Sequence, residues 1–285
     1  MNALNVEFSD NTSKMFEGVE LYLDYTNSRL KILRCQSLSP ELLIKILDFA
    51  KEKRFGKVLS NCRIKDLKHF KDAGFSVEGL INAYFRGEDA FCVSFFIDEK
   101  RASSWRKEEE DKILKMCFER GRLSVPEKLD RKYKMRNCVE NDIPQMVKLF
   151  RAVFKTYPSP VFSTEYLKSV MNSKILFKAV FEGERMISMA SADMDMENLN
   201  AEITDCATYP AYRGQGLLSY LIYELETDLR DRGFYTLYSL SRAINTGINM
   251  SLRKQGYNYG GRLVNNCNIC GGFEDMNIWV KLIYK

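Results

Sequence analysis

Hydrophobic and polar positions from residue 131 onward switch repeatedly between a helical period and a strand period. Apolar residues three and four apart predict helices that begin after Asp142 and that cover 163–172, 216–232 and 245–254. Shorter apolar or alternating stretches predict a hairpin over 174–194 and strands at 133–139, 199–208, 235–240, 257–268 and 276–283. The expected fold class is α/β with a mixed sheet.

The first part of the chain repeats the later elements of this plan in a looser form. Helix 40–53 precedes the stretch 54–61, much as helix 216–232 precedes strand 235–240. A helix at 64–72 and strands at 76–86 and 90–97 follow in the matching order. We therefore expect a degenerate αβ domain over 1–100, a charged connector over 101–130 with a helix at 103–123, and a main domain over 131–285. Two unrelated αβ segments are the alternative to a repeat.

Composition bounds the class of protein. A length of 285 residues allows about two domains, and 45% hydrophobic residues are ordinary for a globular protein. The net charge of +5 comes without a concentrated basic stripe, so a small anionic molecule is a better expected partner than nucleic acid. Neither an export leader nor an apolar run of about 18 residues is found, so we expect a cytoplasmic protein without a membrane partner. A homodimer is compatible with this sequence, which fixes no oligomeric state.

The eight cysteines are scattered, and in a chain of this size we expect them to be reduced. Cys267 and Cys270 form a lone CxxC pair, and the single histidine, His69, is distant in sequence. Two thiolates do not complete a zinc site, which normally has four ligands. We expect a structural role for the pair and no metal, with metal or redox work as the alternative.

The segment YPAYRGQGLLSYLIYELE, residues 209–226, places Gly214 and Gly216 immediately before a long amphipathic helix. The first backbone amides of a helix lack partners within the helix and carry partial positive charge. Small residues let phosphate oxygens approach several of these amides at once. Arg-x-x-Gly recurs at 230–233 and 253–256, but both copies end helices. Residues 213–216 are therefore the expected anion site, and a plain strand–turn–helix is the alternative.

In this setting Arg213-Gly214-Gln215-Gly216-Leu217-Leu218 resembles the acetyl-CoA signature of the GNAT acetyltransferases. That signature is (Gln/Arg)-x-x-Gly-x-(Gly/Ala), and Leu218 departs from its last position. The resemblance covers roughly 131–285 and implies a GNAT fold whose loop binds the pyrophosphate of the co-substrate acetyl-CoA. The cofactor-binding residues that it implies are Ala207, Thr208, Arg213, Gly214, Gln215, Gly216, Leu217, Leu218, Ser219 and Asn245.

Two carboxylates on the preceding strand are candidates for a general base. GNAT enzymes with a glutamate base carry it eleven residues before the signature, where this chain has Glu202. Deprotonating an alkyl ammonium with a pKa of about 10.4 at pH 7 costs roughly 4.6 kcal/mol, so a carboxylate that takes the proton promotes attack on a thioester. Strand alternation predicts one face with Glu202, Thr204 and Cys206 and another with Ile203, Asp205 and Ala207. Only one of Glu202 and Asp205 is then expected to face the acceptor. Glu202 is favoured, and structural carboxylates are the alternative.

The usual general acid does not carry over. Many GNAT enzymes place a tyrosine seven residues after an asparagine, where it protonates the leaving thiolate. Asn245 matches the asparagine, but the tyrosine position is Leu252. Tyr209, Tyr257 and Tyr259 are candidate substitutes, each with packing as the alternative, and water can also supply the proton.

The whole length resembles one GNAT subgroup, the enzymes that acetylate the terminal amine of β-lysine. The resemblance lies in the N-terminal extension, the loop YRGQGLLS and the asparagine-rich tail 256–279. Because amides bind both carbonyl and ammonium groups, Asn265, Asn266 and Asn268 are expected to contact an amino-acid acceptor, with polar turns as the alternative. Arg242 or Arg262 would hold its carboxylate. GNAT activity on another polyamine or an amino sugar, and a non-catalytic acyl-CoA sensor, are the rival functions.

Overall fold

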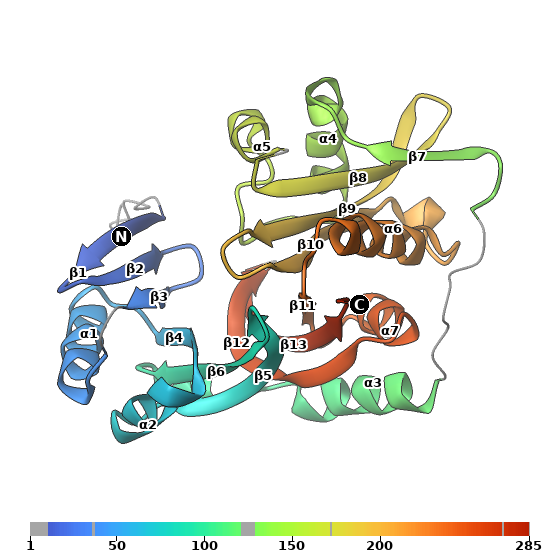
Figure 1. The fold of residues 1–285 in the computed structure, drawn as a ribbon. Helices are drawn as coiled ribbons and strands as arrows, with labels where there is room; N and C mark the ends of the chain where they lie inside the picture. The colour runs from blue at the N-terminus through green and yellow to red at the C-terminus, as the bar shows by residue number, and fades with distance from the viewer. Residues whose placement is uncertain (1–10, 36–37, 121–128, 172, 270, 285) are drawn as a thin grey trace, which may run out of the picture.

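The computed structural model describes residues 11–35, 38–120, 129–171, 173–269 and 271–284. Strands from these segments form one continuous sheet in the order β1-β2-β3-β4-β6-β5-β12-β13-β11-β10-β9-β8-β7. β1 to β4 lie at the left of Figure 1, and β7 to β10 lie at its upper right. We call β1 to β6 with their helices the N-terminal half and β7 to β13 with theirs the C-terminal half. The fold is a mixed α/β sheet that both halves share.

The elements of the C-terminal half follow the predicted order, and their bounds differ from the expected ones by a few residues. They are β7 (Tyr133–Asn137), α4 (Ile143–Val153), α5 (Thr164–Val170), β8 (Ile175–Glu182), β9 (Arg185–Asp195), β10 (Asn200–Thr208), α6 (Leu217–Asp231), β11 (Thr236–Arg242), α7 (Thr246–Lys254), β12 (Asn258–Ile269) and β13 (Gly272–Leu282). As predicted, Gly233 ends α6, with a left-handed φ of 81°.

The N-terminal half contains the predicted elements and three strands that the sequence analysis did not predict. The additional strands are β1 (Thr12–Phe16), β2 (Val19–Asp24) and β3 (Arg29–Cys35). The predicted elements are α1 (Pro40–Glu52), β4 (Lys57–Cys62), α2 (Ile64–Asp72), β5 (Ser76–Phe85) and β6 (Glu88–Phe96). The connector contains α3 (Lys107–Glu119), which is shorter than the expected helix.

The two halves repeat one topology. β3 and β4 are parallel neighbours joined through α1, as β10 and β11 are parallel neighbours joined through α6. The sheet order β4-β6-β5 on one side is mirrored by β11-β13-β12 on the other. This shared order is what a degenerate repeat of the same half-domain would give, and the division of the chain into domains stays a prediction. β7, α4 and α5 belong to the C-terminal half alone among the described residues.

The halves meet where β5 crosses β12, at the register pair Gly79 and Gly261. A Cβ on Gly260 would lie 2.3 Å from the Leu80 carbonyl oxygen, and one on Gly261 would lie 2.4 Å from that of Glu78. Only glycine lets the two backbones approach this closely. Buried apolar residues of both halves, among them Ile81, Ala90, Cys92, Leu263 and Ile278, form a common core at this seam.

Helices cover both faces of the sheet in the C-terminal half. Buried residues of α4 and α5 pack with Phe177, Met189 and Ala207 on one face, which we call the α4 face. Buried residues of α6 and α7 pack with Ala192 and Ile203 on the other, the α6 face. A separate core holds the N-terminal half together between its strands, α1 and α2. The sheet therefore fixes which side chains of β10 can reach each face.

Candidate active site

A gap opens between β10 and β11, at the edge from which α6 starts. The two strands are paired in parallel only from Asn200 to Glu202, opposite Thr236 to Tyr238. Beyond this point Ser239 Oγ donates to the Ile203 carbonyl oxygen at 2.7 Å, and the strands diverge. A cleft of about 2440 Å³ begins here and is lined by β10, β11, the loop before α6 and strands of the N-terminal half. The cleft is thus built by both halves of the chain.

The loop before α6 presents backbone amides to this cleft. Gly214 and Gly216 have left-handed φ values of 80° and 74°, and a Cβ on either would meet no protein atom within 4 Å. The glycines are therefore needed for the turn of the backbone, while the space beside them is open. Gly216 is the N-cap of α6, and no side chain of the described residues caps this helix. An anion can fill that role.

The corresponding helix of the N-terminal half begins differently. The Ser39 side chain is the N-cap of α1 and accepts a hydrogen bond from the Leu42 amide at 3.2 Å. A capped first turn leaves fewer amides for a phosphate. Of these two corresponding helices, only α6 begins without a side-chain cap among the described residues.

The other residues predicted to bind the cofactor surround this loop. Arg213 Nε donates to the Thr208 carbonyl oxygen at 3.3 Å, and Gln215 Oε1 accepts from the Tyr133 hydroxyl at 2.6 Å. Residues 213–220 and Thr208 line the cleft, with Leu217 buried and Leu218 and Ser219 partly exposed. Asn245 also lines it, and its Oδ1 caps α7 by accepting from the Gly247 amide at 3.1 Å. The Ala207 side chain is buried on the α4 face instead.

The carboxylates of β10 lie differently from the prediction. Asp205 and Cys206 form a β-bulge opposite β9, and Asp205 has a left-handed φ of 49°. The bulge breaks the alternation. Asp205 Oδ2 accepts from Ser191 Oγ at 2.8 Å, and Ser191 is the register partner of Thr204. Asp205 therefore lies on the same face as Glu202 and Thr204, so the expectation that only one carboxylate faces the acceptor side is wrong.

The same face carries a third carboxylate. Asp193 on β9 is the register partner of Glu202, and Glu202, Asp205 and Asp193 all line the cleft. Burial, reinforced by the Asp193 carboxylate, raises the pKa of Glu202 to about 7. Burial raises the pKa of Asp205 to about 6 and that of Asp193 as well. This cluster can accept a proton near neutral pH and can bind ammonium groups.

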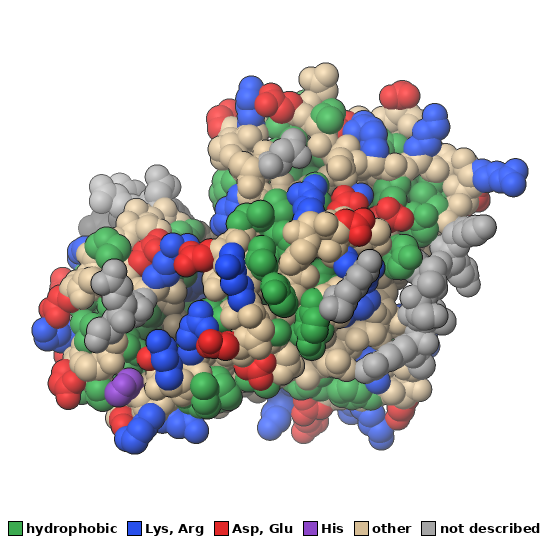
Figure 2. Space-filling view, in the orientation of Figure 1, with side chains coloured by type: hydrophobic (Ala, Val, Ile, Leu, Met, Phe, Trp, Pro, Cys, Tyr) green, Lys and Arg blue, Asp and Glu red, His purple; other side chains and the backbone are tan. Residues whose placement is uncertain are grey.

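The N-terminal half supplies the opposite wall of the cleft, which the sequence analysis missed. Lys31 on β3 lines the cleft, and its positive charge acts on both Glu202 and Asp193. The neighbouring Arg29 guanidinium, together with burial, lowers the pKa of Lys31 to about 8. In Figure 2 the surface is indented between the N-terminal lobe at the left and the upper lobe, and acidic and basic side chains intermingle on this face. The alternation of charged and apolar residues in RLKILRC, 29–35, is the signal that could have identified β3.

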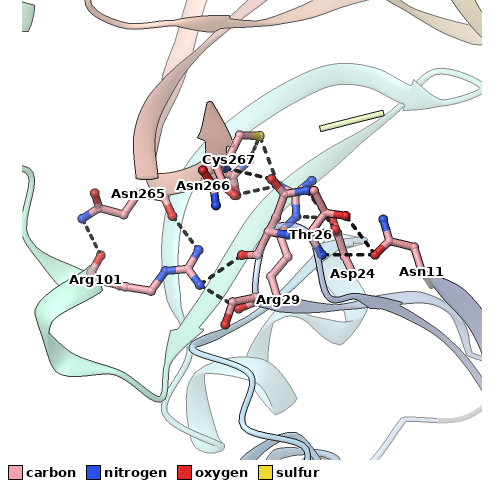
Figure 3. A network of polar contacts seen from close by, with 11 residues as sticks. Asn11, Asp24, Thr26, Arg29, Arg101, Asn265, Asn266 and Cys267 are labelled. Atoms are coloured by element: carbon pink, nitrogen blue, oxygen red, sulfur yellow. Dashed lines mark hydrogen bonds and ion pairs between the residues drawn. The ribbon is translucent and has the colours of Figure 1, made fainter. Parts of the chain in front are cut away.

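The asparagine-rich tail mainly joins the two halves. Asn265 Nδ2 donates to the carbonyl oxygens of Arg101 and Ser103, and its side chain does not line the cleft (Figure 3). The backbone N–H of Asn268 donates to Asn27 Oδ1 at 2.8 Å. Asn266 is buried and lines the cleft, so it alone of the three predicted asparagines lies at the site.

The two predicted carboxylate clamps are engaged with acidic side chains. Arg242 lines the cleft, but both Nε and a terminal nitrogen of its guanidinium donate to the Glu274 carboxylate. Arg262 lies outside the cleft and pairs with Asp111 at 2.8 Å. Both guanidinium groups are therefore already engaged with acidic side chains of the protein.

Of the remaining sequence candidates, Cys267 lines the cleft and the three tyrosines do not. Tyr257 is buried beside Glu226, Tyr259 packs against Trp279, and Tyr209 packs in the α4-face core. Cys267 accepts from Arg29 at 3.4 Å, and Cys270 lies outside the described residues. In the part of the chain that the structure describes, no group of three or more His, Cys, Asp and Glu side chains is placed to hold a metal ion. None of the described helices is long and apolar enough to span a membrane.

An opened pair of parallel strands, an uncapped glycine loop and a helix between them define an acetyltransferase site of the GNAT type. The acetyltransferase (GNAT) family profile matches residues 143–257. The chain belongs to this family and is an N-acetyltransferase.

Three relatives match this chain over most of their own length, and two of them share one name. The chain is 36% identical over 250 residues to a β-lysine N(6)-acetyltransferase of Methanosarcina mazei, with 81% of this chain and 92% of the relative covered. It is 32% identical to the enzyme of that name in Methanococcus maripaludis, with 90% and 93% covered. It is 35% identical to N-acetyltransferase YodP of Bacillus subtilis, with 93% and 96% covered. The similarity therefore includes the N-terminal half.

Proposed function

We propose that this chain transfers an acetyl group from acetyl-CoA to the terminal amine of β-lysine, giving Nε-acetyl-β-lysine. The observation that carries the proposal is that the loop before α6 and the three carboxylates Asp193, Glu202 and Asp205 line one cleft. A loop suited to an anion and a cluster suited to an ammonium group thus face the same space, as a reaction between a thioester and an amine requires. The names of two relatives supply the acceptor.

The loop residues fit the pyrophosphate of acetyl-CoA. The amides of 214–219 would hold the phosphate oxygens, and the open space beside Gly214 and Gly216 leaves room for them. Arg213 adds a positive charge at the same place, and its bond to the Thr208 carbonyl oxygen holds the loop against the end of β10. Thr208 and Asn245, both at the cleft, would contact the pantetheine arm. When bound, acetyl-CoA supplies an activated carbonyl group.

Glu202 is the proposed general base. Glu202 takes a proton from the bound ammonium group, directly or through water. The lone pair that this frees on the nitrogen forms the new C–N bond, the C–S bond breaks, and the second proton lost by the nitrogen passes to water. A carboxylate with a pKa of about 7 is ionised in half of the molecules at neutral pH and is a stronger base than an ordinary glutamate. The thiolate takes its proton from water, because Leu252 is buried apolar packing where the usual tyrosine would stand.

The second charge of the acceptor has a place in the same cluster. β-Lysine carries two ammonium groups, and Asp193 and Asp205 flank Glu202 on the α4 face. With one amine at Glu202, the other can pair with a neighbouring carboxylate. A diamine is therefore a better match for this face than a monoamine.

The proposal is tested by acetyl transfer with the purified chain. Release of free CoA thiol is measured with β-lysine, α-lysine, spermidine and glucosamine as acceptors, and mass spectrometry locates the acetyl group. We expect the highest kcat/KM for β-lysine and one acetyl group on its terminal amine. A preference for spermidine or glucosamine would refute the acceptor assignment, and binding of acetyl-CoA without turnover of any amine would indicate an acyl-CoA sensor.

A further inference from the structure

The wall of the cleft opposite the carboxylates is formed by β3 of the N-terminal half. Leu30 and Ile32 point into the core of that half, while Arg29 and Lys31 alternate with them on the other side. Lys31 is partly exposed. Within the described part of the chain its ammonium makes neither a hydrogen bond nor an ion pair. Its nitrogen lies 5.7 Å from the centre of the Tyr22 ring. A partly buried cation facing an open cleft is suited to an anionic ligand.

Arg29, its neighbour on the same side of β3, is already engaged. Its Nε donates to Asp24 Oδ2 at 2.7 Å, and a terminal nitrogen donates to the Asn266 carbonyl oxygen at 2.9 Å. Figure 3 shows these contacts, together with those of Arg101 to Asn265. The network fixes β3 to the tail of the C-terminal half. It thereby positions Lys31 without using its ammonium.

Two other cations near this wall are held by acidic partners. Lys57 pairs with Glu78 at 2.7 Å, and the exposed Arg34 pairs with Glu197 at 3.1 Å. The predicted clamps Arg242 and Arg262 are engaged as described above. Lys31 is therefore the cation of β3 that can bind an incoming anion without first giving up an ion pair among the described residues.

We propose that Lys31 binds the carboxylate of the acceptor, so that the N-terminal half forms the part of the acceptor site that selects amino acids over simple amines. This inference rests on the proposed function for the reacting amine and for the cleft. The acceptor then spans the cleft, with its ammonium groups at the carboxylates of β9 and β10 and its carboxylate at β3. The substrate class is an amino acid whose reacting amine is remote from its carboxylate.

In this arrangement, discrimination between acceptors depends on the positive charge of Lys31 and on the negative charge of the acceptor's carboxylate. An acceptor without a carboxylate leaves Lys31 beside two ammonium groups and gains nothing at β3. Sites built to bind a polar group reject analogues that lack it far more strongly than apolar pockets do. We expect wild-type kcat/KM for β-lysine to exceed that for its carboxamide by about 10²-fold, the value of a well-placed charged hydrogen bond of about 2–3 kcal/mol.

The experiment crosses the enzyme variant with the acceptor. Wild type and Lys31→Met are assayed with β-lysine and its carboxamide, and with α-lysine and its carboxamide. In Lys31→Met the preference for the carboxylate is expected to disappear, through a rise in KM for the acids, while kcat/KM for the amides changes by less than about threefold. Lys31→Arg should restore most of the preference. Lys45→Met, at an exposed ion pair on α1 outside the cleft, is the matched control and should behave as wild type.

The outcomes separate this inference from the proposed function. An equal loss on acids and amides, or no loss on either, overturns the role of Lys31 even if β-lysine is the substrate. A wild-type enzyme that prefers the carboxylate form of an amine other than β-lysine, with that preference lost in Lys31→Met, refutes the proposed acceptor and supports Lys31. A wild-type preference for the carboxamides overturns both.

Discussion

Glu202 and Tyr238 are the last register pair between β10 and β11, so the proposed base stands where the two strands part. The ring of Tyr238 lies 5.6 Å from that of Tyr84 on β5, which brings the N-terminal half up to the same point. Asn200, the first residue of β10, donates to the Tyr84 carbonyl oxygen at 2.8 Å. The strand that carries the Glu202 carboxylate is therefore held both by β11 and by β5 of the N-terminal half.

Glu202→Gln is expected to lower kcat/KM for the acceptor at neutral pH by about 10²–10⁴-fold, the usual contribution of a positioned base. The KM for acetyl-CoA should barely change, because the carboxylate lies on the acceptor side of the gap. The wild-type rate should fall as pH drops through about 7, where Glu202 becomes protonated. The rate of the variant should not show this fall at low pH. It should approach the wild-type rate at high pH, where the amine is already neutral. Steady-state kinetics from pH 5.5 to 10 on both proteins measures this, with Glu184→Gln in the exposed β8–β9 turn as the control.

The same substitution is expected to stabilise the folded protein at pH 8. The pKa of Glu202 is about 7 when folded and about 4.3 in an unfolded chain, so the folded state binds more protons between these values. Its free energy of unfolding therefore falls as pH rises through that window. Glutamine does not titrate, so the Tm of Glu202→Gln should rise relative to wild type between pH 4 and 7 and then stay ahead. A Tm of the variant below that of wild type at pH 8 would argue against a buried carboxylate with a raised pKa at this position.

Gly216→Val is expected to raise the KM for acetyl-CoA at least tenfold, because a β-branched residue resists the left-handed φ of 74° and shifts the amides of the loop. The matched control is Gly183→Val, at a left-handed glycine with equally open surroundings in the β8–β9 turn. Both variants should lose similar stability, so a comparison of their Tm values and their CoA affinities separates backbone strain from ligand binding. Unchanged CoA affinity in a folded Gly216→Val protein would remove the loop from the site.

One CoA molecule is expected per chain. The cap that Ser39 places on α1 satisfies the amide that an anion would need, while α6 has no such cap among the described residues. Isothermal titration with CoA should give a stoichiometry near one, and Gly216→Val should weaken this single binding event at least tenfold without leaving a second site of unchanged affinity. A second site per chain would show that the N-terminal half also binds the cofactor.

Asn265→Ala is expected to destabilise the protein by about 1–3 kcal/mol, because the buried carbonyl oxygens of Arg101 and Ser103 lose their donor. If its side chain contacts the acceptor instead, KM for β-lysine should rise in the folded variant. Chemical denaturation and acceptor kinetics on the same preparation distinguish the two roles. We expect the loss in stability with an acceptor KM close to that of wild type.

Local periodicity predicted the helices and most strands because their apolar faces are regular. β1 to β3 were missed, although RLKILRC in β3 alternates, because short strands next to polar turns carry little local signal. The bulge at Asp205 could not be predicted by alternation, since a single residue with positive φ reverses every later side chain of the strand. The repeat itself was visible from the order of helices and glycine-ended turns.

The candidate site was predicted in part. The loop before α6 and Glu202 could be proposed from the sequence because signature and spacing are local, and both line the cleft. Lys31 was not, because 171 positions separate it from Glu202 and only the fold places them on facing walls. The asparagines of the tail were assigned to the acceptor because a strand rich in amides is unusual. Asn265 and Asn268 instead make hydrogen bonds to residues before β7, and sequence patterns do not show such long-range contacts.

The seam between β5 and β12 limits how the chain can be divided. The family profile matches only residues 143–257 and so ends just before β12, yet β12 and β13 lie near the middle of the sheet. A fragment trimmed to the similar region would lack these strands, and one cut at 131 would uncover the apolar side chains of Leu263 and Ile278. The stretch that must be kept for folding is therefore expected to be longer than the stretch that the family profile matches, and the two halves are expected to be inherited and expressed together.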